Sequence, residues 1–230
     1  MGLDNTPVTL SEQLLLNVKM GKPTHSLEIL LAKFEISNLT TCLEDDKSKK
    51  AFWINTYNAF FQILSEREKK IKPDIFREKL ISVAGKLFSL DDIEHGILRK
   101  YRWKYSLGYL PQLFPSPLIK QLAVSVIDFR IHFALNCGAK SCPPIAFYKA
   151  ANIDEQLDLA TKSFLESETF INETSMTVTV SRLMLWFKGD FGGKKGIRQI
   201  LANCFNMNFK LYSIGYRNYD WSAELNKFAE

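Results

Sequence analysis

The chain has 230 residues, of which 46% are hydrophobic and 13% aromatic, so it is long enough to bury a core without disulfide support. Its formal net charge is only +5 and its basic residues are scattered, unlike the concentrated charge of a nucleic-acid-binding protein. No stretch approaches the roughly 20 apolar residues that cross a bilayer. We therefore expect a globular protein that binds no nucleic acid and has no integral membrane segment.

The first residues and the cysteines bear on the compartment. Residues 1–7 contain no basic head followed by an apolar run. We therefore expect no signal peptide and a cytoplasmic location, although a chain whose leader had been removed would look the same. Four cysteines at irregular spacing do not form the framework of a secreted, disulfide-rich protein.

Hydrophobic periodicity predicts many helices and few strands. In the first half of the chain we expect helices at 10–18 and 27–34, a strong helix at 51–68 capped by Ser48, and a helix from a capping box at Ser89 to about residue 104. A loop at 108–117 and a strand at 127–136 follow, and then a helix that opens at Asn152 or Asp154 and ends near 166. The last elements are a strand at 176–181, a short helix at 182–188, a turn at 192–193, a helix at 197–205 and a strand at 209–214.

This order of elements is typical of an α+β protein. We expect a helix-rich single domain, residues 1–230, with a small and mostly antiparallel sheet. Residues 1–49 form an N-terminal helical extension in this prediction, and residues 50–226 form the core.

The predicted helix at 51–68 is apolar almost all round, as buried helices are. Asn55, Asn58 and Gln62 form its polar stripe, and uncharged amides on a buried helix need hydrogen-bond partners. They either hold a turn, a substrate or a histidine, or they form a neutral network that fixes the core. Asn55 and Asn58 are candidate substrate-binding residues on the first interpretation.

His95 lies on the next predicted helix, away from its apolar stripe, with Asp91 at i−4 and Arg99 at i+4. A carboxylate at this spacing can hold the imidazole and raise its basicity, as a catalytic or metal-bound histidine requires. The alternative is a solvated row of weak charge pairs. Glu94 is the adjacent acid. The basic residues at 99–104 are interpreted as cations at the C-terminal end of the helix.

Residues 130–144 bring one of three histidines and two of four cysteines into one short segment. In a strand at 127–136, His132 and Asn136 share one face while Cys137 takes the other. Cys142 follows the break at Gly138 and can fold back onto either face. This geometry favours Cys142 over Cys137 as the thiol partner of His132.

A reactive thiolate needs a nearby positive charge or a set of hydrogen-bond donors. His132, His95 or Lys140 could supply the charge. The backbone N–H groups that follow Gly138 could hold an anion or an oxyanion.

Three other interpretations of the cysteines stay open. Cys137 and Cys142 with His95 and His132 provide four soft ligands, enough for tetrahedral zinc, but structural zinc usually uses two close pairs. The two cysteines could instead form a disulfide in an oxidising compartment. They could also be buried beside a core histidine. We expect no metal and no cofactor.

Five segments resemble, in order, those of the family catalogued as domain of unknown function 547. They are residues 52–59 (Phe-Trp-Ile-Asn-Thr-Tyr-Asn-Ala), 89–99 (Ser-Leu-Asp-Asp-Ile-Glu-His-Gly-Ile-Leu-Arg), 130–144, 186–193 and 219–222. The resemblance spans about residues 50–226. It implies a site at the motif positions Asn55, Asn58, Glu94, His95, Arg130, His132, Asn136, Cys137 and Cys142.

A buried helix followed by a strand with a histidine is also similar to the core of papain-like and transglutaminase-like cysteine enzymes. In those enzymes the cysteine begins the buried helix. Here Asn55 lies on that helix and the thiols follow the histidine, so the chain departs from their pattern.

The favoured hypothesis is a cysteine-dependent hydrolase or acyl transferase that acts on a peptide or small molecule. Cys142 or Cys137 would be the nucleophile and His132 or His95 the general base, oriented by Glu94 or Asp91. In this hypothesis substrate is bound by Asn55, Asn58, Arg130 and Asn136. The alternative is a non-catalytic binding or interaction domain whose Cys/His/Asn cluster is structural or binds zinc. The sequence leaves the oligomeric state open.

Overall fold

A computed structural model describes residues 6–229. The expectation about a leader depends mainly on residues 1–5, which lie outside this range. The helices are α1 (Pro7–Lys19), α2 (His25–Lys33), α3 (Ile36–Cys42), α4 (Asp46–Glu66), α5 (Asp74–Arg77), the π-helix η1 (Asp92–Leu98), α6 (Pro117–Leu122), the 3₁₀ helices η2 (Phe129–Phe133) and η3 (Ala150–Asn152), α7 (Ile153–Glu168), α8 (Leu183–Trp186) and α9 (Gly193–Phe205).

The strands are short and form two separate sheets. They are β1 (Ile81–Val83), β2 (Lys86–Phe88), β3 (Phe170–Asn172), β4 (Thr177–Val180) and β5 (Ser213–Tyr216). β1 and β2 form an antiparallel hairpin. The second sheet has the order β3-β4-β5, in which β3 and β4 are antiparallel and β4 and β5 parallel. The predicted helix-rich α+β class is confirmed, with two small sheets in place of one.

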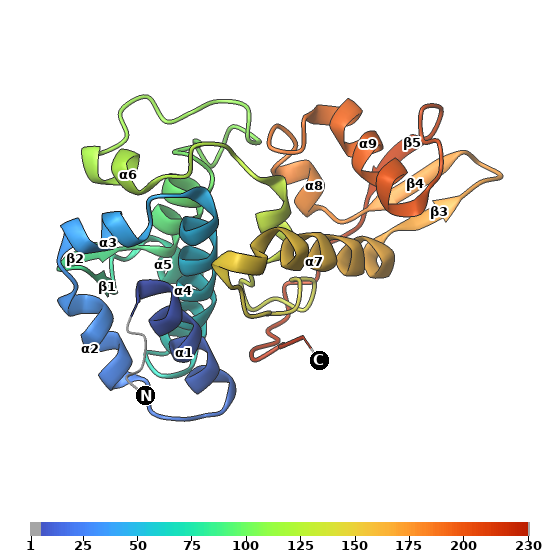
Figure 1. The fold of residues 1–230 in the computed structure, drawn as a ribbon. Helices are drawn as coiled ribbons and strands as arrows, with labels where there is room; N and C mark the ends of the chain where they lie inside the picture. The colour runs from blue at the N-terminus through green and yellow to red at the C-terminus, as the bar shows by residue number, and fades with distance from the viewer. Residues whose placement is uncertain (1–5, 230) are drawn as a thin grey trace.

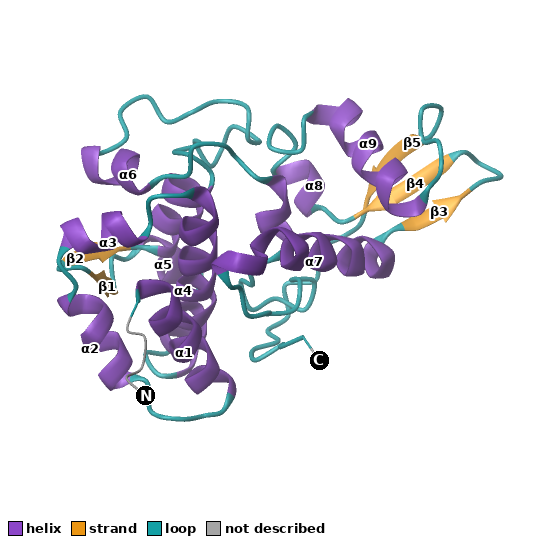
Figure 2. Cartoon of the chain, viewed as in Figure 1, coloured by secondary structure: helices purple, strands orange, loops and turns teal. Residues whose placement is uncertain are grey.

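The molecule has two halves, each with its own apolar cluster (Figures 1 and 2). In one half, α1, α2, α3 and the β1–β2 hairpin surround α4. This half buries Leu14, Trp53 and Phe88, among others. In the other half, α7, α8 and α9 lie with the three-stranded sheet and bury residues such as Phe164 and Val178. Helix η2 joins them, because Ile131 belongs to the first cluster and Phe133 to the second.

Helix α4 is the buried helix that the sequence predicts, and every residue from 50 to 64 is buried. It begins earlier than predicted. Asp45 is the N-cap and accepts a hydrogen bond from the Ser48 backbone N–H at 2.9 Å, so Ser48 lies inside the first turn.

The predicted capping box at Ser89 is confirmed. The Asp92 N–H donates to Ser89 Oγ and the Ser89 N–H donates to Asp92 Oδ2, each at 3.0 Å. The helix differs from the prediction in type and length. It is a π-helix, with an i→i−5 bond of 2.9 Å from the Arg99 N–H to the Glu94 carbonyl, and it ends at Leu98.

The predicted strand at 127–136 is wrong. Its middle, Phe129–Phe133, is helix η2, whose N-cap Asp128 accepts a hydrogen bond from the Arg130 N–H at 3.1 Å. Alternation normally indicates one wet face and one buried face, yet both His132 and Asn136 are buried here along with the apolar residues between them. The strand at 176–181 is confirmed as β4, and the last predicted strand lies a few residues later, as β5.

Candidate functional site

A tight turn carries the two central cysteines, and we call residues 137–142 the cysteine turn. The Cys142 N–H donates to the Ala139 carbonyl at 2.9 Å, which closes the turn. Gly138 has φ +69°, and a Cβ there would lie 2.5 Å from a ring carbon of Phe61 on α4. Glycine is therefore required on both conformational and steric grounds.

Asparagine side chains fix the backbone around this turn. Asn58 donates to the Ala134 carbonyl and accepts from the Asn136 N–H, both at 2.9 Å. Asn136 donates to the Pro143 carbonyl and accepts from the Gly138 N–H, both at 2.8 Å. Asn55 bonds both backbone groups of Tyr148 in the same way. All three amides are fully buried and bind main chain, so they position the turn and its neighbouring segment.

The C-terminal segment lies against the same turn. The Lys140 N–H donates to the Ser222 carbonyl at 2.9 Å, and the Glu224 N–H donates to the Gly138 carbonyl at 2.9 Å. This pairing delivers Tyr219, whose hydroxyl lies 3.1 Å from Cys142 Sγ. The tyrosine therefore reaches the sulfur from 77 positions further along the chain.

Cys142 Sγ accepts hydrogen bonds from several donors. The Cys137 N–H lies 3.1 Å away and Cys137 Sγ 2.7 Å away. Burial opposes ionisation, but hydrogen bonds from the Cys137 thiol, the Tyr219 hydroxyl and backbone N–H groups outweigh it and lower the pKa of Cys142 to about 6. The bond to Cys142 and burial raise the pKa of Cys137 well above its ordinary value. Cys142 is therefore the thiolate of the pair.

Both histidines belong to a buried chain of charges that we call the Arg99 centre: His95, Arg99, His132 and Asp190. Arg99 donates through Nη1 to His95 Nδ1 at 2.7 Å and through Nε to Asp190 Oδ2 at 2.6 Å. The same carboxylate oxygen lies 2.9 Å from His132 Nε2. Because a guanidinium only donates, the His95 proton sits on Nε2, which lies 3.6 Å from Asp91 Oδ1.

The two histidines are neutral at pH 7. Burial and the charge of Arg99 lower the pKa of His95 well below its ordinary value. Burial lowers the pKa of His132 to about 4, although its bond to Asp190 works in the opposite direction. The predicted rise in the basicity of His95 is therefore wrong, because Arg99 contacts the ring directly. The pKa of the Cys142 thiol is therefore lowered by hydrogen-bond donors and not by a protonated histidine.

Glu94 is the acid that titrates near neutrality. Burial raises its pKa to about 7, against the attraction of Arg99. Its Oε2 accepts a hydrogen bond from the Tyr57 hydroxyl at 3.3 Å, and its Oε1 lies 3.8 Å from His95 Nδ1. Burial also raises the pKa of Tyr57, so this hydroxyl stays protonated and remains a donor.

Thiols, imidazoles and this carboxyl share one cavity of about 200 Å³, which we call the cysteine cavity. Trp221 is exposed and Cys137 partly exposed, so one side of the cavity reaches the surface. Its wall is mostly apolar and comes from both halves of the molecule. The lining residues are Tyr57, Phe76, Asp91, Glu94, His95, His132, Leu135, Cys137, Cys142, Leu183, Trp186, Phe187, Tyr219 and Trp221.

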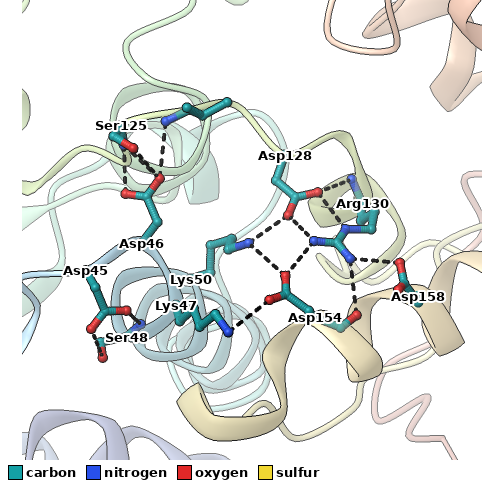
Figure 3. Close-up of polar contacts among 11 residues, drawn as sticks. Asp45, Asp46, Lys47, Ser48, Lys50, Ser125, Asp128, Arg130, Asp154 and Asp158 are labelled. Atoms are coloured by element: carbon teal, nitrogen blue, oxygen red, sulfur yellow. Dashed lines mark hydrogen bonds and ion pairs between the residues drawn. The ribbon is translucent and has the colours of Figure 1, made fainter.

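The structure separates the predicted site residues into three groups. Glu94, His95, His132 and both cysteines line the cysteine cavity, whereas the asparagines lie behind its wall. Arg130 belongs elsewhere, in a cluster that we call the Arg130 centre: Lys50, Asp128, Arg130, Asp154 and Asp158 (Figure 3). Arg130 Nη2 lies 2.7 Å from the Asp128 carboxylate and 2.8 Å from the Asp154 carboxylate.

Sequence reasoning missed four members of the site: Tyr57, Arg99, Asp190 and Tyr219. Arg99 was interpreted as an exposed cation at a helix end, yet it is fully buried. Asp190 and Tyr219 lie inside segments 186–193 and 219–222, which the resemblance singled out without giving any residue a role. Asp190 is the one acid in the first of these segments, and this was the available signal for it.

Two features are absent from residues 6–229. No group of three or more His, Cys, Asp or Glu side chains in this range is arranged to hold a metal ion. No helix there is long and apolar enough to span a membrane.

Comparison with known proteins identifies the chain by family alone. No curated protein and no solved structure matches it. A family match covers residues 41–165, which includes every predicted site residue and Arg99; the expected similarity up to residue 226 is not matched beyond 165, so Asp190 and Tyr219 lie outside it. The matching family is described as "Protein of unknown function, DUF547", and because the match covers more than half of the chain, the protein belongs to this family.

Proposed function

We propose that the protein is a cysteine-dependent acyl transferase or hydrolase with Cys142 as nucleophile. One observation carries this proposal. The Cys142 sulfur accepts hydrogen bonds from Tyr219 and from the Cys137 backbone, and it faces a cavity that it shares with Glu94. A sulfur held in this way is ionised near neutral pH without a partner imidazolium.

The reaction follows from the two titrating groups. The Cys142 thiolate attacks the carbonyl carbon of an acyl donor, and a thioester forms as the bond to the leaving group breaks. Protonated Glu94 gives its proton to the leaving group. Ionised Glu94 then takes a proton from water or an acceptor, whose oxygen attacks the thioester and restores the thiolate. A pKa of about 7 suits this exchange of roles.

Other residues take supporting roles in this proposal. Asn58 and Asn136 hold the turn that carries the nucleophile, and the Arg99 centre holds the wall behind it. Burial lowers the pKa of both His95 and His132, so they are weak proton acceptors and serve to bind and orient groups. The small, mainly apolar cavity favours a short acyl group over a bulky or charged one.

Alkylation of the folded protein tests the nucleophile. Iodoacetamide at pH 7 should modify Cys142 at least about tenfold faster than Cys204, because burial raises the pKa of Cys204. The rate at Cys142 should fall as pH drops through about 6. Equal, slow labelling of the two residues would contradict the proposal.

A chromogenic ester tests the chemistry itself. p-Nitrophenyl acetate should give a burst of nitrophenolate with the full chain and none with Cys142→Ser. Cys204→Ser is the matched control, because Cys204 is only partly buried and lies outside the cysteine cavity. A burst that survives Cys142→Ser would exclude Cys142 as the acylated residue.

We further propose a reducing compartment such as the cytoplasm, because a nucleophilic Cys142 must be a free thiol and the neighbouring sulfur of Cys137 could form a disulfide with it in an oxidising one. Thiol counting on protein isolated from its native source under alkylating conditions tests this point. Four free thiols per chain would agree with it, and two would point to an oxidised pair.

A further inference from the structure

The cysteine turn holds two thiols where acyl transfer needs one. Their sulfurs are 2.7 Å apart, and both line the cysteine cavity. The two sites are unequal. Cys142 is 2% exposed and receives hydrogen bonds, whereas Cys137 is partly exposed and shares Tyr219 only at 3.8 Å. A sulfur that accepts several hydrogen bonds and contacts a protonated thiol is arranged as an attacking cysteine beside a resolving cysteine.

We infer that Cys137 and Cys142 form a dithiol site that reduces small hydroperoxides, with Cys142 as the attacking and Cys137 as the resolving cysteine. This activity is distinct from acyl transfer and does not depend on it.

The proposed reaction balances in two steps. The Cys142 thiolate attacks one peroxide oxygen, the O–O bond breaks, and Cys142 becomes a sulfenic acid while the other oxygen leaves as an alcohol or water. Cys137 then loses its proton and attacks the Cys142 sulfur, which releases water and forms a disulfide. The peroxide gains two electrons and the two thiols lose them. An external small thiol would restore the dithiol for a further turnover.

Glu94 is placed to assist the first step. It lines the same cavity, and the departing oxygen needs a proton. The hydroxyl of Tyr57, on α4, donates a hydrogen bond to the Glu94 carboxyl and holds it in the wall of the cysteine cavity. The protonated carboxyl supplies the proton that turns the leaving alkoxide or hydroxide into alcohol or water.

The second step needs little movement. The two sulfurs must approach by about 0.7 Å to reach the ~2.05 Å of a disulfide bond. Both side chains project from one turn closed by a hydrogen bond from the Cys142 N–H to the Ala139 carbonyl. Cys142 also has hardly any exposed surface, so a protein disulfide cannot reach it, whereas a hydroperoxide fits a cavity of about 200 Å³.

The test uses the reduced full chain with one equivalent of hydrogen peroxide or of cumene hydroperoxide. We expect loss of two thiols, a peptide pair linked through Cys137 and Cys142 in a non-reducing map, and recovery of both thiols with dithiothreitol. Cys142→Ser should abolish the fast phase of peroxide consumption. Cys137→Ser should keep that phase but stop at a sulfenic acid, which dimedone traps on Cys142. Cys204→Ser should behave like the unmodified chain.

Two outcomes would overturn the inference. One is peroxide consumption that Cys142→Ser leaves unchanged, and the other is oxidation of Cys142 in the unmodified chain without the linked peptide. The second readout needs no variant, so it holds even where a substitution prevents folding. An ester burst without peroxide reduction would leave acyl transfer standing alone, and peroxide reduction without a burst would leave the dithiol site standing alone.

Discussion

The Arg130 centre and the Arg99 centre are both built around an arginine, but they differ in burial and in how their charges are paired. Each uses an arginine to join segments far apart in the chain. Arg130 donates to Asp128, which caps η2, and to Asp154 and Asp158 on α7, and Lys50 adds a second cation to Asp128 at 2.7 Å (Figure 3). Arg99 is fully buried and meets one carboxylate, that of Asp190.

The two centres also differ in how completely their polar atoms are bonded. Within residues 6–229, Arg99 Nη2 and Asp190 Oδ1 are buried without a hydrogen-bond partner, whereas no side-chain atom of the Arg130 centre is in that condition. Unpartnered buried polar atoms cost free energy, and folded proteins keep few of them. The Arg130 centre is therefore fully hydrogen-bonded, whereas the Arg99 centre, whose two histidines line the cysteine cavity, is not.

Removing Arg99 is the strongest way to break this comparison. Arg99→Leu leaves the Asp190 carboxylate buried without its guanidinium, and we expect it to cost about 3–5 kcal/mol of unfolding free energy. Urea melts measure the loss. The double variant Arg99→Leu/Asp190→Asn should recover part of the stability, because it removes the stranded charge. An equal loss in both variants would show that packing, and not charge, is responsible.

The amides behind the cavity sharpen the comparison next. Asn58→Ala unpairs the Ala134 carbonyl and the Asn136 N–H, so we expect a loss of about 2–4 kcal/mol. Asn55→Ala is the matched control, since it unpairs two backbone groups of Tyr148 instead. Both variants should lose similar stability, but only Asn58→Ala should slow alkylation of Cys142. Identical alkylation rates in the two would show that Asn58 does not position the nucleophile.

Glu94, which lines the cysteine cavity, makes the stability of the protein depend on pH. Its pKa is about 7 in the folded chain against an ordinary 4.5, so the folded state holds a proton that the unfolded state has lost between these values. The contribution of Glu94 to stability should therefore fall as pH rises from 4.5 to 7, by about 1–3 kcal/mol. Glu94→Gln should remove this decline and be more stable than the unmodified chain at pH 8. Urea melts at pH 4.5, 6 and 8 measure it, and parallel curves for both proteins would contradict it.

His132 works in the other direction over much of this range. Its pKa is about 4 when folded against an ordinary 6.5, so the unfolded chain binds the extra proton and stability falls as pH drops from 6.5 to 4. The Glu94→Gln comparison isolates one of the two opposing slopes.

The smallest effect belongs to the Arg130 centre. Arg130→Leu should cost about 1 kcal/mol, because Lys50 stays with Asp128 and the partners Asp154 and Asp158 face water. High salt should reduce this cost further. Urea melts at two salt concentrations provide the measurement. A loss as large as that of Arg99→Leu would remove the distinction between the two centres.

Local signals in the sequence predicted much of this molecule. The apolar surface of α4 and the reciprocal bonds of Ser89 and Asp92 depend on neighbouring residues, so they could be read from the chain. The sequence favoured Cys142 over Cys137 as the thiol partner of His132, and the choice of Cys142 as nucleophile stays a prediction. In the structure the groups beside its sulfur are Cys137 and the Tyr219 hydroxyl, while His132 bonds Asp190.

Long-range contacts account for what the sequence did not predict. Helix η2 was taken for a strand because tertiary packing buries its polar residues as well as its apolar ones. Arg99 was taken for a surface cation because its partner Asp190 lies 91 positions away. The sequence left open whether Asn55 and Asn58 hold a turn, a substrate or a histidine or fix the core, because their main-chain partners lie 93 and 76 positions away.

The hydrogen bond from Tyr219 has a consequence for how the protein is made. The cysteines leave the ribosome well before the tyrosine that tunes one of them, and the strand-like pairing of residues 138–140 with 222–224 forms only after both are free. Before this pairing forms, the Cys142 thiol lacks the hydrogen bond from Tyr219 that helps to lower its pKa. In the proposed function, Cys142 therefore becomes reactive only once the C-terminal segment lies against the cysteine turn.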